Sequence, residues 1–215
     1  MARSLEARFG MPTRAPERDL IAGLVRTVLS QNTTDTNSSR AYMKLRERFP
    51  RWDDVERADA RSIEAAIRSG GLARTKARRI KALLREIRRT RGSLDLGFLR
   101  RKDTDEVIEY LLGMDGVGPK TAACVALFDL GRDVMPVDTH VHRIIRRTGV
   151  VGSPSGREVT YRALRGLVPK GTALSLHVNL VRLGRELCHP RSPRCEDCPI
   201  RRDCAQGLLG GCGTP

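Results

Sequence analysis

Residues 111–128 read LLGMDGVGPKTAACVALF. Apolar residues flank a glycine-rich centre on both sides. Gly116 and Gly118 permit positive φ without a Cβ clash and let a partner come close to the backbone. Pro119 suits the first position of a helix, where its missing N–H would have no partner anyway. The stretch therefore predicts a helix, a tight turn and a second helix.

Two other glycine-rich motifs are excluded here. A P-loop needs Gly-Lys-Ser/Thr after a strand, but Pro119 separates Gly118 from Lys120 and the preceding pattern is helical. A dinucleotide-binding turn needs a third glycine, and Thr121 or Ala122 stands at that place. The motif is therefore interpreted as a helical hairpin.

The hairpin predicts a phosphate site and raises the question of what Lys120 does. The amides of Gly116, Val117 and Gly118 are expected to converge outward, where the helix dipole adds positive potential. The same potential disfavours an ammonium on Lys120 in the first helical turn, and a neutral lysine amine is a nucleophile that can form a Schiff base. From the residues alone, Lys120 could equally contact phosphate or lie on the surface without a chemical role.

The periodicity of the rest of the chain is helical. Apolar stripes at three- and four-residue spacing cover residues 20–29, 80–87, 107–112 and 174–181, with glycine and proline breakers between them. No convincing alternating strand pattern occurs. The predicted fold class is all-α.

Composition indicates a polyanionic partner. The 215 residues carry 40 Lys+Arg against 25 Asp+Glu, a net charge of +15. Such a basic domain usually faces nucleic acid, although an arginine-rich proteome would give the same balance. The basic face of residues 72–91 is either a DNA-facing surface or simply a solvated one. No secretory signal or long apolar run is present, so a cytoplasmic, nucleoid-associated protein without membrane contact is expected.

Four of the six cysteines crowd into one short segment near the C-terminus. They are Cys188, Cys195, Cys198 and Cys204, separated by six, two and five residues. In a reducing compartment this spacing favours metal binding, and four thiolates can hold either zinc or an iron–sulfur cluster. Of the other two, Cys124 is expected in the core and Cys212 is left unassigned.

Two segments together resemble a known family. LLGMDGVGPKTAACVA (111–126), followed by VMPVDTHVHRIIRRTGV (134–150), is similar to the helix-hairpin-helix, Gly/Pro-rich loop and aspartate signature of the DNA glycosylase superfamily. Within that superfamily the chain resembles endonuclease III, and the similarity covers about residues 20–204. The resemblance implies two all-α lobes.

The resemblance also implies the domain boundaries. A six-helix barrel lobe would cover residues 18–128, with the helix-hairpin-helix at about 105–127. Residues 1–17 and 129–215 would form the second lobe, which carries the cluster loop 188–204.

The activity implied is that of a bifunctional DNA glycosylase and AP lyase of base excision repair. It would remove oxidised pyrimidines from double-stranded DNA and cleave abasic sites by β-elimination, acting as a monomer. Lys120 matches the Schiff-base lysine and Asp138 the catalytic carboxylate. From the residues alone, Asp138 reads as a helix N-cap, and the resemblance implies both roles.

Two turns match the family segments that support the flipped nucleotide. Asn32, in SQNTTD, stands where the family usually has Gln, and Leu72 matches the apolar wedge residue. Structurally, Asn32 could merely end a helix and Leu72 could be core. Gly70 replaces a usual aliphatic residue, and Asp115 stands where Pro is frequent, so an acid lies beside the phosphate site unless it caps the next helix.

The cysteine spacing matches the [4Fe-4S] loop of endonuclease III-like enzymes. The resemblance therefore implies a [4Fe-4S] cluster with a structural role and all four cysteines as ligands. Arg191 and Arg194, between the first two ligands, would meet DNA phosphates. His140 and His142 near the aspartate are expected to be structural or to contact DNA.

Three rival functions remain. A monofunctional mismatch glycosylase would keep Asp138 and the cysteines, but the presence of Lys120 argues against it. A non-catalytic hairpin module would dock on DNA without needing Lys120 or Asp138. An iron–sulfur electron carrier would explain the cysteines but neither the hairpin nor the charge.

Overall fold

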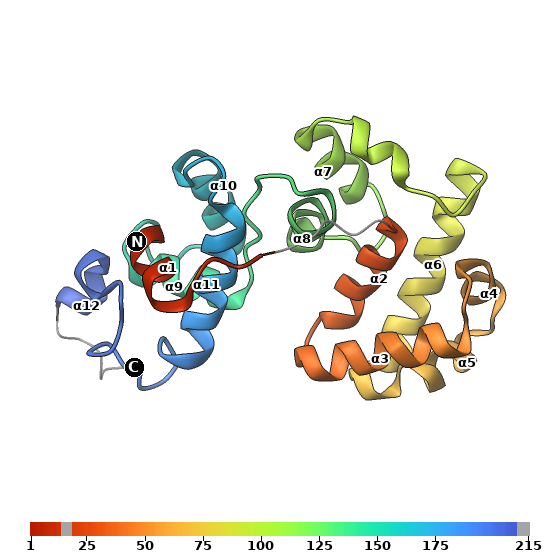
Figure 1. Cartoon of the computed structure of the whole chain (residues 1–215), viewed down its shortest axis with the longest axis horizontal. Helices are drawn as coiled ribbons and strands as arrows, with labels where there is room; N and C mark the ends of the chain where they lie inside the picture. The colour runs from red at the N-terminus through yellow and green to blue at the C-terminus, as the bar shows by residue number, and fades with distance from the viewer. Residues whose placement is uncertain (14–18, 210–215) are drawn as a thin grey trace. The chain divides into compact units, whose positions relative to one another are not determined.

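The computed structural model describes residues 1–13 and 19–209, and this part of the chain is built from helices without a β-strand (Figure 1). The predicted all-α class is confirmed. Contacts divide the chain into two compact units, one of Pro16–Arg132 and one of Met1–Ala15 with Asp133–Pro215. None of the described helices combines the length and apolarity needed to cross a lipid bilayer.

The unit Pro16–Arg132 is organised around two buried helices. Its helices are α2 (Leu20–Ser30), α3 (Asp35–Arg48), α4 (Trp52–Arg57), α5 (Ala60–Ala66), α6 (Ala73–Arg91), α7 (Thr104–Leu112) and α8 (Pro119–Leu130), with 3-10 turns η1 (Arg68–Gly70) and η2 (Gly97–Arg101). Helices α2 and α8 are buried on most of their surface, as apolar residues all round a helix require. A Cβ on Gly23 would lie 2.2 Å from Cγ of Asp129, so the glycine lets α8 approach α2 closely. Cys124 is buried in α8, which confirms its predicted core position.

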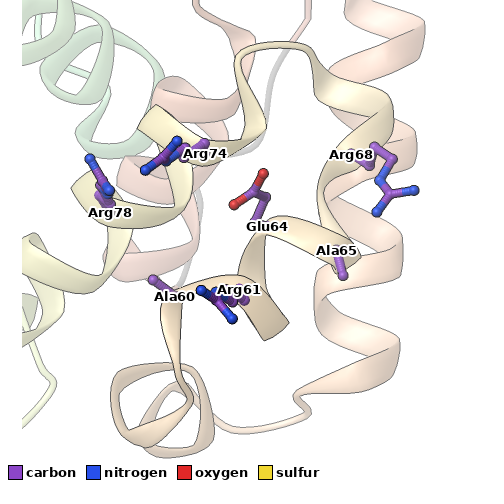
Figure 2. Close-up of a pocket in the computed structure, with 7 residues that line it drawn as sticks. All are labelled: Ala60, Arg61, Glu64, Ala65, Arg68, Arg74 and Arg78. Carbon is purple, nitrogen blue, oxygen red and sulfur yellow. The ribbon is translucent and has the colours of Figure 1, made fainter.

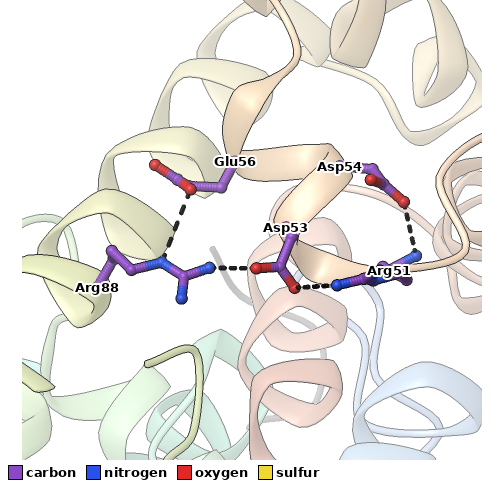
Figure 3. A network of polar contacts seen from close by, with 5 residues as sticks. All are labelled: Arg51, Asp53, Asp54, Glu56 and Arg88. Atoms are coloured by element: carbon purple, nitrogen blue, oxygen red, sulfur yellow. Dashed lines mark hydrogen bonds and ion pairs between the residues drawn. The ribbon is translucent and has the colours of Figure 1, made fainter. Parts of the chain in front are cut away.

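Helix α4 is tied to α6 by a small ionic network (Figure 3). The Arg88 guanidinium of α6 pairs with Asp53 and lies 3.8 Å from Oε2 of Glu56. Its hydrogen bond to Asp53 lowers the pKa of that carboxyl, and Arg51 adds a contact of 3.7 Å. One arginine of the basic face of α6 is therefore used inside the protein.

The second unit joins the N-terminal helix to the C-terminal third of the chain. Its helices are α1 (Ala2–Phe9), α9 (Thr139–Arg147), α10 (Arg157–Leu167), α11 (Ala173–Glu186) and α12 (Ala205–Leu208), with the 3-10 turn η3 (Arg201–Asp203). Apolar side chains of α1, α9 and α11 share its core. The Ser175 hydroxyl donates to Oε1 of Glu6 at 2.6 Å, and the Asn179 amide donates to the Gly10 carbonyl at 3.0 Å. Residues 1–13 thus pack with α11 although they are far from it in sequence.

Candidate active site

The helix-hairpin-helix predicted from the sequence is formed by α7, the turn 113–118 and α8. Gly116 has φ +77°, the positive value that was predicted. Gly118 has φ −91° and ψ 174°, so the prediction of positive φ there is wrong. The reason is that Gly118 is the N-cap of α8, and N-cap residues take extended backbone. A Cβ on Gly118 would meet nothing within 4 Å in this chain.

One of the backbone amides that were predicted to bind phosphate at this turn is not available to a ligand. The Val117 N–H donates to the Met114 carbonyl at 3.1 Å, so it closes the turn and does not point toward a ligand. In the described part of the chain, the amides of Gly116 and Gly118 have no acceptor, and α8 begins without a side-chain cap. The Lys120 amide is also an orphan donor of the first helical turn. These donors leave an anion site at the start of α8 that does not use Val117.

Lys120 is half-buried in the first turn of α8, next to an anchored residue. The buried Thr121 hydroxyl accepts from Nε2 of Gln31 at 3.2 Å, and Oε1 of Gln31 accepts from Nη1 of Arg79 at 2.7 Å. A Cβ on Gly116 would lie 2.7 Å from Nε of Arg79, so the turn packs directly on that arginine. Side chains of α6 and of the residue after α2 therefore anchor Thr121, the residue that follows Lys120. Sequence reasoning missed both Gln31 and Arg79.

Asp138 belongs to the second unit and is the N-cap of α9. Its Oδ1 accepts from the Val141 amide at 2.8 Å, so the capping role is confirmed. The extended segment before it is fixed by His177, whose Nδ1 lies 3.0 Å from the Pro136 carbonyl. The catalytic role of Asp138 stays a prediction.

The two turns expected to support a flipped nucleotide share an unusual backbone. Asn32 has φ +51° and Leu72 has φ +50°, a region that non-glycine residues rarely occupy. Both side chains are exposed, and Leu72 exposes 59% of its surface, so the core alternative for Leu72 is wrong. An exposed leucine held in a strained conformation is typical of a functional position. Asn32 does follow the end of α2, as the simpler interpretation expected.

A buried lysine links the two turns. Nζ of Lys76 donates to the Leu29 carbonyl at 2.7 Å and to the Gly70 carbonyl at 2.8 Å. Lys76 exposes only 3% of its surface, and burial lowers the pKa of its ammonium. The end of α2, before Asn32, and the loop before Leu72 are thus tied to one side chain. The sequence analysis did not identify this residue.

The two departures from the family pattern have local explanations. A Cβ on Gly70 would lie 3.0 Å from the Ala41 Cβ, so this position is too crowded for a larger residue unless α3 moves. Asp115 is exposed, and its amide donates to Oε2 of Glu86 at 3.3 Å. Its side chain does not cap α8, because α8 has no side-chain cap. Asp115 therefore leaves a negative charge beside the hairpin turn.

The four C-terminal cysteines line one pocket of the second unit. Its wall is completed by apolar residues that include Ile144, Leu183 and Ile200. Burial raises the pKa of the Cys198 thiol, and neighbouring Cys188 and Cys204 raise it further. Among the described residues, no group of three or more His, Cys, Asp or Glu side chains is arranged to hold a metal ion. Cys212 lies outside the described residues.

Arginines of α9 hold the first part of the cysteine loop. The Arg143 guanidinium donates to the Cys188 carbonyl at 2.8 and 3.1 Å. Nη1 of Arg147 donates to the His189 carbonyl at 2.7 Å and lies 3.1 Å from the Cys188 sulfur. Arg194, expected to meet DNA, forms an ion pair with Asp197 at 2.6 Å. Arg191 is exposed and stays a predicted DNA contact.

Both histidines near Asp138 make internal contacts. Nδ1 of His140 lies 3.1 Å from Nη2 of Arg143, and Nδ1 of His142 lies 2.8 Å from the Thr160 hydroxyl. Burial and then the charges of Arg146 and Arg157 lower the pKa of His142. Both residues therefore make internal contacts of the structural kind that was expected, and the alternative of a DNA contact stays a prediction.

Comparisons with known proteins place these features in a family. Residues 25–170 match the family model described as HhH-GPD superfamily base excision DNA repair protein. A putative DNA glycosylase of Arabidopsis thaliana is 43% identical over 169 residues, which are 79% of this chain and 58% of that protein. Endonuclease III of Thermotoga maritima is 34% identical, with 95% of this chain and 90% of that protein covered.

The fold has a solved counterpart. A trapped covalent intermediate of endonuclease III with DNA, an estranged-adenine complex, matches with a TM-score of 0.81 at 27% identity. The match covers 98% of this chain and 95% of the solved one. Together with the helical hairpin and the all-helical units, these matches show that the chain belongs to the HhH-GPD superfamily of base excision DNA repair proteins and has the endonuclease III fold.

Proposed function

We propose that this chain is a bifunctional DNA glycosylase and AP lyase that acts on double-stranded DNA with oxidised pyrimidines or abasic sites. One observation carries the proposal. Lys120 lies in the first turn of α8, beside backbone amides that have no hydrogen-bond acceptor among the described residues, and a side-chain hydrogen bond anchors the next residue, Thr121. The likeness to endonuclease III supports the same assignment.

The reaction begins with binding of the sugar–phosphate backbone. Backbone phosphates next to the lesion bind the amides of Gly116 and Gly118, and the start of α8 adds its positive dipole end. The damaged nucleotide is turned out of the duplex. The neutral amine of Lys120 attacks C1′ of its sugar, the C1′–N bond breaks and the base leaves with the electron pair. A proton then reaches the base.

The covalent intermediate explains strand cleavage. Loss of a proton from the Lys120 nitrogen and opening of the sugar ring give an imine between lysine and C1′. The imine acidifies the proton at C2′, and its removal expels the 3′ phosphate by β-elimination. Asp138, at the start of α9, stabilises the positive charge that develops at C1′ and assists these proton transfers.

The exposed turns support the distorted duplex. Leu72, which is 59% exposed, enters the base stack opposite the lesion. Asn32 contacts the estranged base through its amide. Because Lys76 ties the segments that precede both residues, the two turns enter the duplex together.

We also propose that Cys188, Cys195, Cys198 and Cys204 hold a [4Fe-4S] cluster. All four cysteines line one pocket with apolar walls, and Arg147 places a cation beside the Cys188 sulfur, which supports this group. In this structure Cys195 is disulfide-bonded and the described sulfurs are not arranged as a ligand set, so binding of the cluster would require Cys195 to be reduced and the loop to rearrange. Four thiolates are the usual ligand set of such a cluster. When bound, the cluster supplies structural cross-links for the loop and no step of the reaction.

A borohydride trapping experiment tests the function. Enzyme mixed with a duplex containing one abasic site should form a covalent protein–DNA adduct when borohydride reduces the imine. Lys120→Ala should abolish the adduct and retain DNA binding. Lys44→Ala is the matched control, because Lys44 is an exposed lysine of α3. Equal trapping in wild type and Lys120→Ala would overturn the proposal.

A further inference from the structure

A basic pocket lies on the unit Pro16–Arg132, away from the hairpin turn in sequence. It has a volume of about 560 Å³ and is formed by α5, η1 and the first half of α6. Four arginines line it, Arg61, Arg68, Arg74 and Arg78, together with Glu64. Figure 2 shows Glu64 between the arginines of α6 and Arg68. The remaining lining residues are two alanines.

The charge of the pocket is not neutralised by the protein. None of the four arginines forms an ion pair with a carboxylate in the described residues, and all four are exposed. Arg88, farther along α6, behaves differently, because it is paired with Asp53 and Glu56. Four guanidinium groups around a single carboxylate leave a strong positive potential in the pocket.

The lining chemistry selects the kind of ligand. Planar guanidinium groups bind phosphate oxygens in pairs, and arginine is the usual residue where phosphates are recognised. The pocket has no aromatic ring on which a base could stack, and its apolar surface is limited to alanine methyls. These features suit a run of backbone phosphates better than a free nucleotide.

The position of the pocket in the chain indicates which phosphates. Leu72 stands between Arg68 of η1 and Arg74 in the first turn of α6. We infer that the pocket binds backbone phosphates of the DNA duplex that flank the point where Leu72 enters the base stack. This inference rests on the proposed function, because it takes DNA as the ligand.

The salt dependence of binding tests the inference. The test variant is Arg74→Gln with Arg78→Gln, and the matched control is Arg85→Gln with Arg89→Gln. Both pairs are exposed, lie four residues apart on α6 and remove two charges, but only the first lines the pocket. The ligand is a duplex with a central tetrahydrofuran abasic analogue, which is not cleaved, and affinity is measured against salt concentration.

The pocket variant should lower the slope of log affinity against log salt by about 1.8, since each phosphate contact contributes about 0.9. Between 50 and 200 mM salt, wild type should therefore lose about 12-fold more affinity than the pocket variant. The control pair should leave the slope close to that of wild type. Equal slopes in the two double variants would overturn the inference. They would overturn it even if wild type also bound free pyrophosphate.

Two further measurements separate this inference from the proposed function. Shortening one arm of the duplex should remove the difference between wild type and the pocket variant, whereas shortening the other arm should leave it. If neither arm matters, the pocket does not follow the flanking backbone. Borohydride trapping at saturating enzyme and low salt should be unchanged in the pocket variant. If borohydride trapping is normal but the two double variants have equal salt slopes, only the inference about the pocket is refuted. If the slopes differ but no adduct is trapped, only the proposed lyase activity is refuted.

Discussion

The hairpin turn 113–118 belongs to the proposed phosphate site and the cysteine loop 188–204 would hold the proposed cluster, and the protein holds these two segments in different ways. The turn lies between two helices, and its Met114 and Val117 side chains are buried. Arg79 packs against it, and the Gln31 bond to Thr121 fixes the helix that follows. Core packing and side-chain hydrogen bonds thus position the turn without any bound group.

The cysteine loop has fewer apolar anchors. Arg143 and Arg147 of α9 bind carbonyls at its beginning, and Ile200 is the buried apolar side chain within its described residues. All four cysteines line one pocket, and of these Cys188 and Cys198 also pack against the core of the second unit. From this contrast we expect removal of the proposed cluster to affect the loop more than the turn.

The largest effect is expected where the loop loses a cluster ligand. Cys198→Ser should remove iron from the purified protein and expose residues 188–204 to protease, because four-thiolate sites supply much of the folding energy of short loops. Cys124→Ser should keep the iron, since Cys124 is buried in α8. Iron analysis and limited proteolysis check both variants. Zinc in place of iron in wild type would contradict the cluster assignment.

A smaller but substantial effect is expected at the tether between the two exposed turns. Lys76→Met should cost about 2–4 kcal/mol in the free energy of unfolding, because the Leu29 and Gly70 carbonyls lose their donor. Lys81→Met is the control, since Lys81 binds one carbonyl, that of Ala58. Denaturant unfolding measures the difference. Equal losses in the two variants would mean that Lys76 is not a special anchor.

Substitution by alanine should affect stability differently at the two glycines of the hairpin turn. Gly116→Ala should destabilise the protein by about 1–2 kcal/mol, because φ is +77° and the new Cβ would meet Arg79. Gly118→Ala should leave stability nearly unchanged, because its backbone is extended and its surroundings are open. It should still weaken DNA binding if a phosphate approaches the backbone there. Thermal unfolding and DNA titration separate these outcomes.

The smallest effect is a pH dependence of the second unit. The folded-state pKa of His142 lies below its ordinary value of 6.5, so the unfolded state binds a proton more readily. Stability should therefore fall as the pH drops through 6.5 toward the folded-state value. His142→Gln should weaken this dependence. An unchanged pH profile in the variant would assign the effect to other groups.

Much of the fold could be predicted from local patterns. The apolar stripes at 20–29, 80–87, 107–112 and 174–181 all lie in helices, because helical periodicity places such residues on one buried face. Asp138 caps α9 as its residue type indicates. These features depend on neighbours within a few positions, so the sequence shows them directly.

The contacts that complete the site could not be predicted from local sequence patterns. Gln31 meets Thr121, and Arg79 meets Gln31, across separations of 90 and 48 residues. Lys76 is one cation among nine in residues 72–91, and only the packing of α2 beside α6 makes it a buried donor. Glycine permits positive φ without requiring it, so the conformation of Gly118 also depended on where α8 begins.

The identity of the residue in the trapped adduct would show whether Lys120 is the nucleophile. The reduced protein–DNA adduct would be digested with protease and nuclease, and tandem mass spectrometry would locate the remaining sugar fragment. Besides Lys120, the chain offers five lysines and the amine of Met1 as alternatives, so the assignment is well resolved. We predict that the fragment is on Lys120. A fragment on Met1 or on another lysine would contradict the mechanism proposed here.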